Sequence, residues 1–395
     1  MFANLDLETH NKIVFKKHPL QSDDACPELP RKNCLRLLSY NMFLRPFVKN
    51  VENDWKDERL HAYVQLLDDF DIICNQEVFD FFNYSRKERL ISHAMKAGFI
   101  NYAVAPPAPF FSEYSLSGGL VTFSRFPILE TSFKPYRYGV LSDQISYKGV
   151  LYCKIDVAGA ILHIFQTHTQ ASYFGTSVEE FNITFECRLE QLRIIRMFIE
   201  EKTRNATSDE LIILCGDINV NGAKVDRKGQ VYRDMVKDKP EFKAVLDEYE
   251  REYDLLISIL TNNNEDVAVD VMRQANSGVS PVTFGDCYID EKGKEHPLET
   301  QLVKVEDHCT QQSLDYIFQI KRGFNVEKER LQIENQKTAS GTHSNEPKSQ
   351  NGKSKHKKLV VSIEESRIEK FFFDSHPVIK QCSDHYGVST ILKLV

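Results

Sequence analysis

Polar side chains capable of acid–base and metal chemistry recur in this sequence at one kind of place, where a short apolar run ends or begins. Asn41, Glu77 and His168 end the runs LLSYN, DIICNQE and HIFQTH. Further residues of this kind flank three more runs: Asp217, Asn219, Asp315, Asp384 and His385. Because a sheet presents side chains to a ligand cleft at the carboxyl ends of its strands, we expect these residues to share one site.

Three of these residues favour an oxygen-ligated divalent metal. Asn41, Glu77 and Asp384 offer hard oxygen donors, and no Cys or His pair at zinc spacing accompanies them. That donor set favours Mg²⁺ or Mn²⁺ over Zn²⁺. Magnesium also keeps water ligands and binds the phosphate oxygens of substrates.

The remaining residues suit the hydrolysis of a phosphate ester. His168 and His385 can supply acid, base or phosphate-contacting groups. Asp217, Asn219 and Asp315 can orient them. With a metal and an activated water, this set predicts a phosphoesterase. A serine hydrolase is disfavoured because the sequence has no GxSxG elbow, and a P-loop kinase because it has no GxxxxGK[ST] motif.

The elements that must position these residues are mostly strands. Helical periodicity is restricted to three segments, 55–68, 178–201 and 245–260. Apolar runs predict strands at 34–43, 71–77, 118–124, 149–157, 160–169, 211–219, 313–320 and 385–394. Several strands follow one another without a helix, so we expect an α+β or layered α/β fold and not a plain doubly wound sheet.

Composition and charge narrow the class of protein further. The 395 residues carry a net charge of −7, which gives no general cationic field and disfavours binding to nucleic acid. Nine cysteines without a CxxC pair predict buried free thiols in a reducing, cytoplasmic compartment. The charged start of the chain predicts no signal peptide, and no apolar run is long enough to span a bilayer. We therefore expect a soluble protein, or one attached peripherally to a membrane surface.

The chain is predicted to hold one catalytic domain, residues 34–395, preceded by a loosely held arm, residues 1–33. Residues 335–358 carry six lysines, one glutamate and one alanine as their only aliphatic residue. Such a segment cannot bury enough apolar surface to fold, so we expect a disordered insertion there, either a solvated loop without function or a contact with an anionic membrane surface.

Six motifs in a fixed order resemble a known superfamily. SYN, NQE, TH, GDIN, LDY and SDH are similar to the endonuclease/exonuclease/phosphatase superfamily, whose fold is a DNase I-like four-layered α/β sandwich of two packed mixed sheets flanked by helices. Within it the chain most resembles the neutral sphingomyelinases. The supporting stretches are QEVFD (76–80), SGGLVTFSRFPI (117–128), DQISYKGV (143–150), THTQASY (167–173), LCGDINV (214–220) and PVTFGD (281–286).

The resemblance assigns a role to each position. Glu77 would be the principal ligand of Mg²⁺ or Mn²⁺, assisted by Asn41 and Asp384. One metal ion or two are both compatible with this set.

On the catalytic side, the resemblance makes His385 the general base and Asp315 the residue that orients its imidazole. Asp217 and Asn219 would position the water and a phosphate oxygen, and His168 would stabilise the phosphoryl oxygens. Lys148 matches the lysine of the Asp…Lys-Gly element, with a surface lysine near a turn as the alternative.

The resemblance implies a metal-dependent phosphodiesterase that hydrolyses sphingomyelin to ceramide and phosphocholine at a phospholipid surface. The alternatives are an inositol-polyphosphate 5-phosphatase, an endonuclease of the same superfamily, or a catalytically silent binding module. QEVF replaces the QETK of apurinic-site endonucleases, and QQSLDYIF lacks the P-x-W-C-D-R pattern of the 5-phosphatases. The exact lipid, its headgroup and the oligomeric state stay open.

One loop is a candidate membrane contact. Residues 106–117 read PPAPFFSEYSLS, in which the prolines disfavour a helix and Phe110 and Phe111 are adjacent. Neighbouring residues of an extended loop point to opposite sides, so a core buries both less readily than one. We therefore expect either an exposed aromatic tip beside the active-site mouth or rings that pack back onto the domain.

Overall fold

The computed structural model describes residues 14–17, 33–46, 54–79, 85–172, 177–223, 237, 240–262, 267–321 and 357–395. The predicted insertion at 335–358 lies outside these ranges except for its last two residues, and so does the predicted arm at 1–33 except for residues 14–17 and 33.

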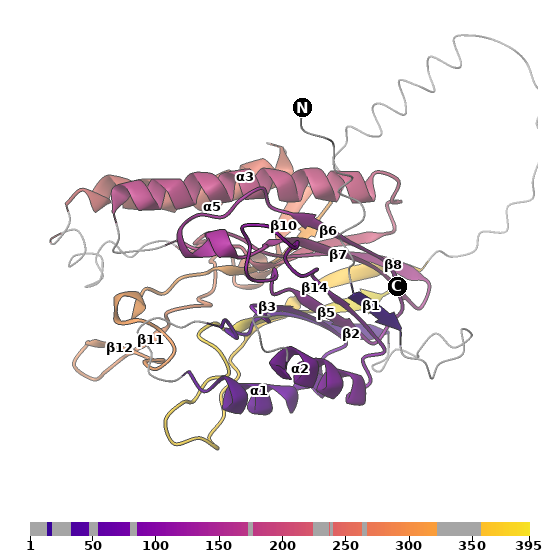
Figure 1. The fold of residues 1–395 in the computed structure, drawn as a ribbon, viewed down its shortest axis with the longest axis horizontal. Helices are drawn as coiled ribbons and strands as arrows, with labels where there is room; N and C mark the ends of the chain where they lie inside the picture. The colour runs from indigo at the N-terminus through magenta and orange to yellow at the C-terminus, as the bar shows by residue number, and fades with distance from the viewer. Residues whose placement is uncertain are drawn as a thin grey trace, which may run out of the picture.

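Two mixed sheets form the centre of the molecule (Figure 1). The first has the order β1 (Val14–Lys17), β4 (Asn101–Val104), β5 (Val121–Ser124), β3 (Ile72–Gln76), β2 (Cys34–Asn41), β15 (Gly387–Leu394) and β14 (Leu359–Glu369). The second has the order β10 (Ala268–Asp270), β13 (Asp315–Ile320), β9 (Leu211–Asp217), β8 (Ala160–His168), β7 (Gly149–Val157) and β6 (Ile128–Pro135). Each sheet contains one parallel pair, β2 with β3 and β8 with β9.

Helices cover the outer face of each sheet, so the molecule has four layers (Figure 1). α1 (Lys56–Val64) and α2 (Ser85–Lys96) pack on the first sheet, while α3 (Val178–Thr203) and α5 (Phe242–Thr261) pack on the second. Shorter elements are α6 (Val271–Ala275), the 3₁₀ turns η2 (Leu67–Asp69), η3 (Leu141–Ile145) and η5 (Val305–Asp307), and the hairpin β11 (Cys287–Ile289) with β12 (Glu295–Pro297). The predicted four-layered sandwich is confirmed.

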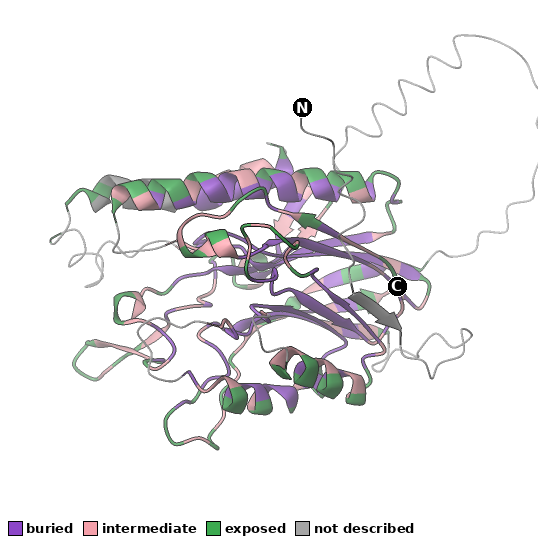
Figure 2. Ribbon diagram, viewed as in Figure 1, coloured by how far each residue is buried: buried purple, intermediate pink, exposed green. Residues whose placement is uncertain are grey.

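The central strands are apolar on both faces because both faces are covered. In β9, Ile213 and Cys215 point into the core between the sheets, whereas Ile212 and Leu214 pack under α3 and α5. This alternation explains the uninterrupted run LIILC. Figure 2 shows the strands buried and the outer faces of the helices exposed. Cys74 of β3 and Cys153 of β7 also lie in the core between the sheets, and none of the eight described cysteines forms a disulfide.

The longest helix, α3, shows why these helices begin and pack as they do. The hydroxyl of Ser177 accepts a hydrogen bond from the amide of Glu180 and caps the first turn. Leu192, Ile195 and Ile199 recur at helical spacing and contact the second sheet. No helix within the described ranges is both long and apolar enough to cross a bilayer.

Candidate active site

The predicted residues meet at one end of the sandwich because of strand register. β2 and β3 run parallel and end together at Asn41 and Gln76, and Glu77 follows. β8 and β9 also run parallel, with His168 beside Asp217. β13 is antiparallel to β9 and starts where β9 ends, which places Asp315 opposite Asp217.

Just after the ends of three of these strands, one residue has a left-handed backbone conformation. Phe43, Glu77 and Asn219 have φ of 50°, 57° and 53°. Asn tolerates this region, whereas a bulky Phe or a Glu there costs on the order of 1–3 kcal/mol. Such strain concentrates where function fixes a side chain, and here it turns Glu77 at the end of β3.

A glycine makes the close pairing of β8 and β9 possible. A Cβ on Gly216 would lie 1.9 Å from the carbonyl oxygen of Thr167. Any other residue there would push the two strands apart. The Gly of the GDIN motif is therefore needed to keep His168 beside Asp217.

His385 and Asp315 form a buried pair. The imidazole Nδ1 lies 2.8 Å from Asp315 Oδ2, and Nε2 lies 3.7 Å from Asp217 Oδ2. Burial alone would lower the pKa of His385, but the carboxylates of Asp315, Asp217 and Asp384 raise it well above its usual value. The pair with Asp315 fixes the tautomer and leaves Nε2 facing the site, the geometry that a general base requires.

Asn41 joins the two sheets through its amide group. Its Nδ2 donates to Glu77 Oε1 at 3.1 Å and to Asp217 Oδ2 at 2.9 Å, while its Oδ1 accepts from the amide of Phe43 at 3.0 Å. In this arrangement Asn41 is a donor to carboxylates. That Asn41 ligates a metal through its side-chain oxygen stays a prediction. It requires the amide group to rotate so that Oδ1, and not Nδ2, is directed at the ion.

The carboxylates of the site fit a divalent cation. Ligand atoms of Glu77, His168 and Asp217 lie within 4.8 Å of one another. The buried Glu77 Oε2 finds no hydrogen-bond partner among the described residues. Burial, together with the neighbouring Glu77 carboxylate and against the opposing effect of His385, raises the pKa of Asp217 to about 7 and that of Asp384 to about 6. An uncompensated cluster of buried negative charge is what a bound divalent ion would neutralise.

Lys148 is a buried residue of the site, so the alternative of a surface lysine is wrong. Its Nζ donates to Asp143 Oδ2 at 2.8 Å and to the carbonyl of Thr169 at 2.9 Å, and lies 3.3 Å from His168 Nε2. Burial and the charge of Lys148 hold the pKa of His168 well below its usual value. His168 is therefore neutral beside a fixed cation.

Asn219 forms hydrogen bonds within the same group of residues. Its backbone amide donates to Asp217 Oδ1 at 3.0 Å, and its Nδ2 donates to the carbonyl of Thr169 at 3.2 Å. Both Asp217 and the segment after His168 are thereby held in place.

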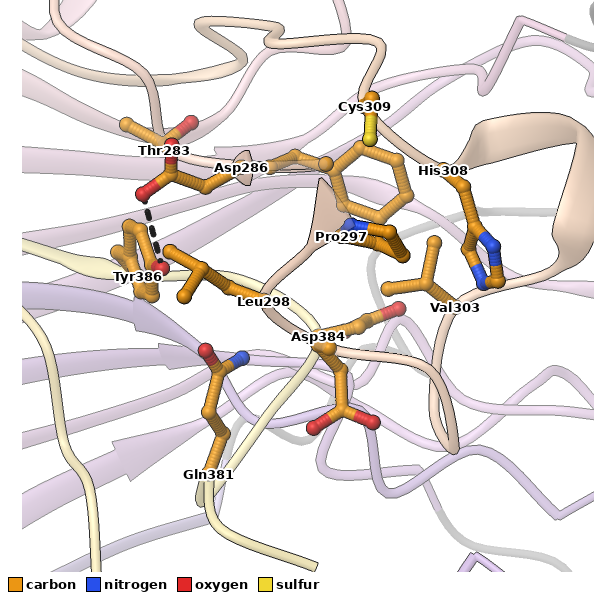
Figure 3. A pocket seen from close by; sticks show the side chains of 13 residues that line it. Thr283, Asp286, Pro297, Leu298, Val303, His308, Cys309, Gln381, Asp384 and Tyr386 are labelled. Carbon is orange, nitrogen blue, oxygen red and sulfur yellow. Dashed lines mark hydrogen bonds between the residues drawn. The ribbon is translucent and has the colours of Figure 1, made fainter. Parts of the chain in front are cut away.

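A cavity of about 120 Å³ opens onto these residues. Its walls include most of the predicted set, namely Glu77, His168, Asp217, Asn219, Asp384 and His385. Asp315 lies behind His385 and does not line it. A second cavity beside Asp384, shown in Figure 3, has only about 10 Å³, room for roughly one water molecule.

The cavity also contains charged residues that the motifs did not indicate. Arg45, Lys304 and Asp307 line it together with the rings of Phe43 and Phe284. The Arg45 guanidinium lies 4.5 Å from the Phe43 ring centroid, and its buried Nε has no hydrogen-bond partner within the part of the chain that the structure describes. Burial raises the pKa of Asp307 to about 6.

A fully buried arginine, also unpredicted, ties two site segments together. Arg59 of α1 donates to the carbonyls of Met42 and Phe43, which follow Asn41, and to the carbonyl of Cys382, which precedes Asp384. It thereby holds the end of β2 against the segment that carries Asp384 and His385. Its helical position in a charged stretch gave no signal of this role.

Comparisons with known proteins identify relatives of the chain and of its fold. No family model matches the chain. A sphingomyelinase of Dictyostelium discoideum is 33% identical over 379 residues, which cover 88% of this chain and 77% of that protein. Sphingomyelinase C of Listeria ivanovii is 28% identical over 214 residues, 51% of this chain and 59% of its own length. A crystal structure of a Staphylococcus aureus beta toxin double mutant with bound magnesium ions covers 90% of this chain and 98% of its own, with a TM-score of 0.50 and 19% identity, and so shares the fold.

Proposed function

The chain belongs to the sphingomyelinase family, and we propose that it is a phospholipase C-type phosphodiesterase that cleaves sphingomyelin to ceramide and phosphocholine. The observation that carries the proposal is one cavity lined by His385, His168 and the carboxylates of Glu77, Asp217 and Asp384, behind which Asp315 holds His385 and Lys148 lies 3.3 Å from His168. A base, a site for a divalent ion and a cation for the phosphate are what phosphodiester hydrolysis by water requires.

His385 is the proposed general base. Once a bound divalent ion offsets the carboxylates that raise the pKa of His385, its Nε2 would accept a proton from the attacking water, while Asp315 keeps the other ring nitrogen protonated and stabilises the imidazolium that forms. Asp217, 3.7 Å from the same Nε2, is positioned to orient that water.

A divalent ion, Mg²⁺ or Mn²⁺, is the proposed cofactor, held by Glu77 with Asp384 and Asn41. When bound it would polarise a phosphoryl oxygen and offset the charge of the buried carboxylates. The unpartnered oxygen of Glu77 and the raised pKa of Asp384 support this assignment.

The phosphate group is proposed to lie against His168, Lys148 and Asn219. Lys148 supplies a fixed positive charge, and the amide of Asn219 supplies a donor at the end of β9. Positioned donors of this kind stabilise the charge that develops on the phosphoryl oxygens in the transition state.

The substrate is a membrane lipid, so we propose that the protein works at a cytoplasmic phospholipid surface without spanning it. Nucleic acid is not a proposed substrate, because the chain is acidic overall and a nuclease needs a basic channel along the backbone phosphates.

The test is a substrate panel with purified protein and with His385→Ala as the inactive control. Sphingomyelin, phosphatidylcholine and phosphoinositides in detergent micelles, plasmid DNA and an abasic oligonucleotide are each incubated with Mg²⁺ and with chelator. We expect metal-dependent release of phosphocholine from sphingomyelin ahead of every other substrate. Rapid nicking of DNA without phosphocholine release, or full activity in excess EDTA, would overturn the proposal.

A further inference from the structure

We infer that Phe110 and Phe111 form an aromatic tip that inserts into a zwitterionic lipid bilayer and docks the active-site mouth on it. The inference rests on the proposed function, because a lipid substrate gives the tip its surface. It goes further by naming the residues that make the contact.

The two rings lie in solvent and against each other. The residues are 88% and 98% exposed, and the ring centroids are 4.5 Å apart. Two large adjacent rings that both stand in water form an exposed apolar patch of the kind that marks an interaction surface. The predicted alternative, rings packed back onto the domain, is wrong.

The turn that presents the rings is strained. The amide of Ser112 donates to the carbonyl of Pro109, so Phe110 and Phe111 are the two central residues of a tight turn. Phe111 has φ of 65°, a conformation that glycine or asparagine adopts more readily. A bulky residue in a position that favours glycine, without burial to offset the strain, indicates that the ring serves a purpose outside the folded domain.

The loop is anchored beside the catalytic residues. The amides of Ser115 and Leu116 donate to the carbonyl of Ile145, and Tyr114 packs on Tyr147, the neighbour of Lys148. Just beyond the same end of the loop, a Cβ on Gly119 would lie 3.3 Å from the Cα of Glu77. The tip therefore projects from a base that touches the segments carrying Glu77 and Lys148.

The wall of the cavity also carries an exposed apolar residue. Val305 lies between the cavity-lining residues Lys304 and Asp307 and is 80% exposed. Exposed apolar side chains thus occur both on the loop 106–117 and on a segment that lines the cavity.

The charge of the loop selects the kind of bilayer. Glu113, which is exposed, is the only charged residue of the loop 106–117. Attraction of the tip to an anionic surface would need lysine and arginine clustered beside it. Insertion of apolar rings into a zwitterionic bilayer needs no such charge.

The first test is sedimentation with vesicles of sphingomyelin and phosphatidylcholine, which needs no activity. Phe110→Ala/Phe111→Ala should weaken vesicle binding by about tenfold or more for each ring removed. Phe110→Leu/Phe111→Leu should keep most of the binding. Leu129→Ala is the matched control, because Leu129 is 55% exposed on β6 at the end of the sheet away from Gly149 and Lys148, and its binding should equal wild type.

Two further measurements separate docking from folding and from chemistry. Phe111→Gly removes the ring and suits the positive φ, so its melting temperature should not fall while its vesicle binding does. The alanine pair should hydrolyse a water-soluble phosphocholine ester at the wild-type rate.

The outcomes are distinct. Unchanged vesicle binding in the alanine pair, a loss of several degrees in melting temperature for Phe111→Gly, or self-association through the rings without vesicle binding would each overturn the inference. Failure of the wild type to release phosphocholine from micellar sphingomyelin would instead contradict the proposed function. The sedimentation measurement would still show whether Phe110 and Phe111 contribute to vesicle binding.

Discussion

The floor and the rim of the active site differ in how their side chains are held. The floor comprises Asn41, Glu77, His168, Asp217, Asp315 and His385, all buried and linked by hydrogen bonds or close ion pairs. The rim comprises Phe110, Phe111 and Val305, all exposed. Chemistry needs a fixed geometry, so the floor is determined by several contacts at each residue. Contact with a bilayer needs only apolar surface in the right place.

The comparison predicts that a floor substitution lowers the hydrolysis of every substrate, and the largest loss is expected at His385. His385→Ala removes the proposed general base, and such a loss typically costs about 10²–10⁴ in rate. Turnover of micellar sphingomyelin and of a soluble phosphocholine ester should fall together. If His385→Ala kept more than a tenth of wild-type turnover on either substrate, His385 would not be the base.

Glu77→Gln is the next largest expected effect, because it removes a negative charge from the metal site while keeping the shape of the side chain. Activity should fall by roughly 10²-fold, since a bound ion contributes several kcal/mol of charge stabilisation in the transition state. Calorimetric titration with Mn²⁺ should show weaker binding, and circular dichroism should be unchanged. Wild-type Mn²⁺ affinity in the variant would contradict the assignment.

Arg45 lies between floor and rim, and its substitution sharpens the comparison. Arg45 lines the cavity and its buried Nε has no partner among the described residues, so Arg45→Met should remove a charged hydrogen bond to the substrate phosphate worth about 1.5–3 kcal/mol. We expect kcat/KM to fall by roughly ten- to hundredfold, mainly through KM, on micellar and soluble substrates alike. A loss seen only with vesicles would move Arg45 to the rim.

Val305→Ala should have the smallest effect. It removes part of one exposed side chain, so hydrolysis of vesicle-borne sphingomyelin should fall by about two- to threefold. The soluble phosphocholine ester should be hydrolysed at the wild-type rate. Equal loss on both substrates would show that this segment shapes the cavity and is not part of the rim.

The floor could be predicted from the sequence because its residues stand beside apolar runs, and sheet register then brings those runs to one edge. Arg45, Lys304 and Asp307 could not, because they reach the cavity from irregular segments whose path no local pattern encodes. Arg59 was missed for a similar reason, since a helical arginine looks the same in sequence whether it is buried or solvated.

The sheets were predicted best at their centres. β6 and β14 were missed because they are edge strands with exposed polar residues, so ILETSFKP and LVVSIEESRIE lack a continuous apolar run. α2 was missed because it buries only Leu90 and Ala94 in a charged sequence. Residues 118–120 are predicted as part of a strand, but β5 begins at Val121, and Gly119 lies against the backbone of Glu77 as part of the preceding loop.

The buried thiols between the two sheets can be used to measure how often the sheets separate. Burial raises the pKa of Cys153 to about 12 and that of Cys74 well above its usual range, so neither presents a thiolate to a reagent while the sheets are packed. Labelling of these thiols therefore times the separation of the two layers. Glu77 follows β3 of one sheet and Asp217 ends β9 of the other, and with His168 they form a group that could hold a divalent ion, so an ion that contacted both carboxylates would link the two sheets. Binding of the ion would raise the free energy needed to separate the two sheets. The thiols would therefore be labelled more slowly as the occupancy of the ion rises.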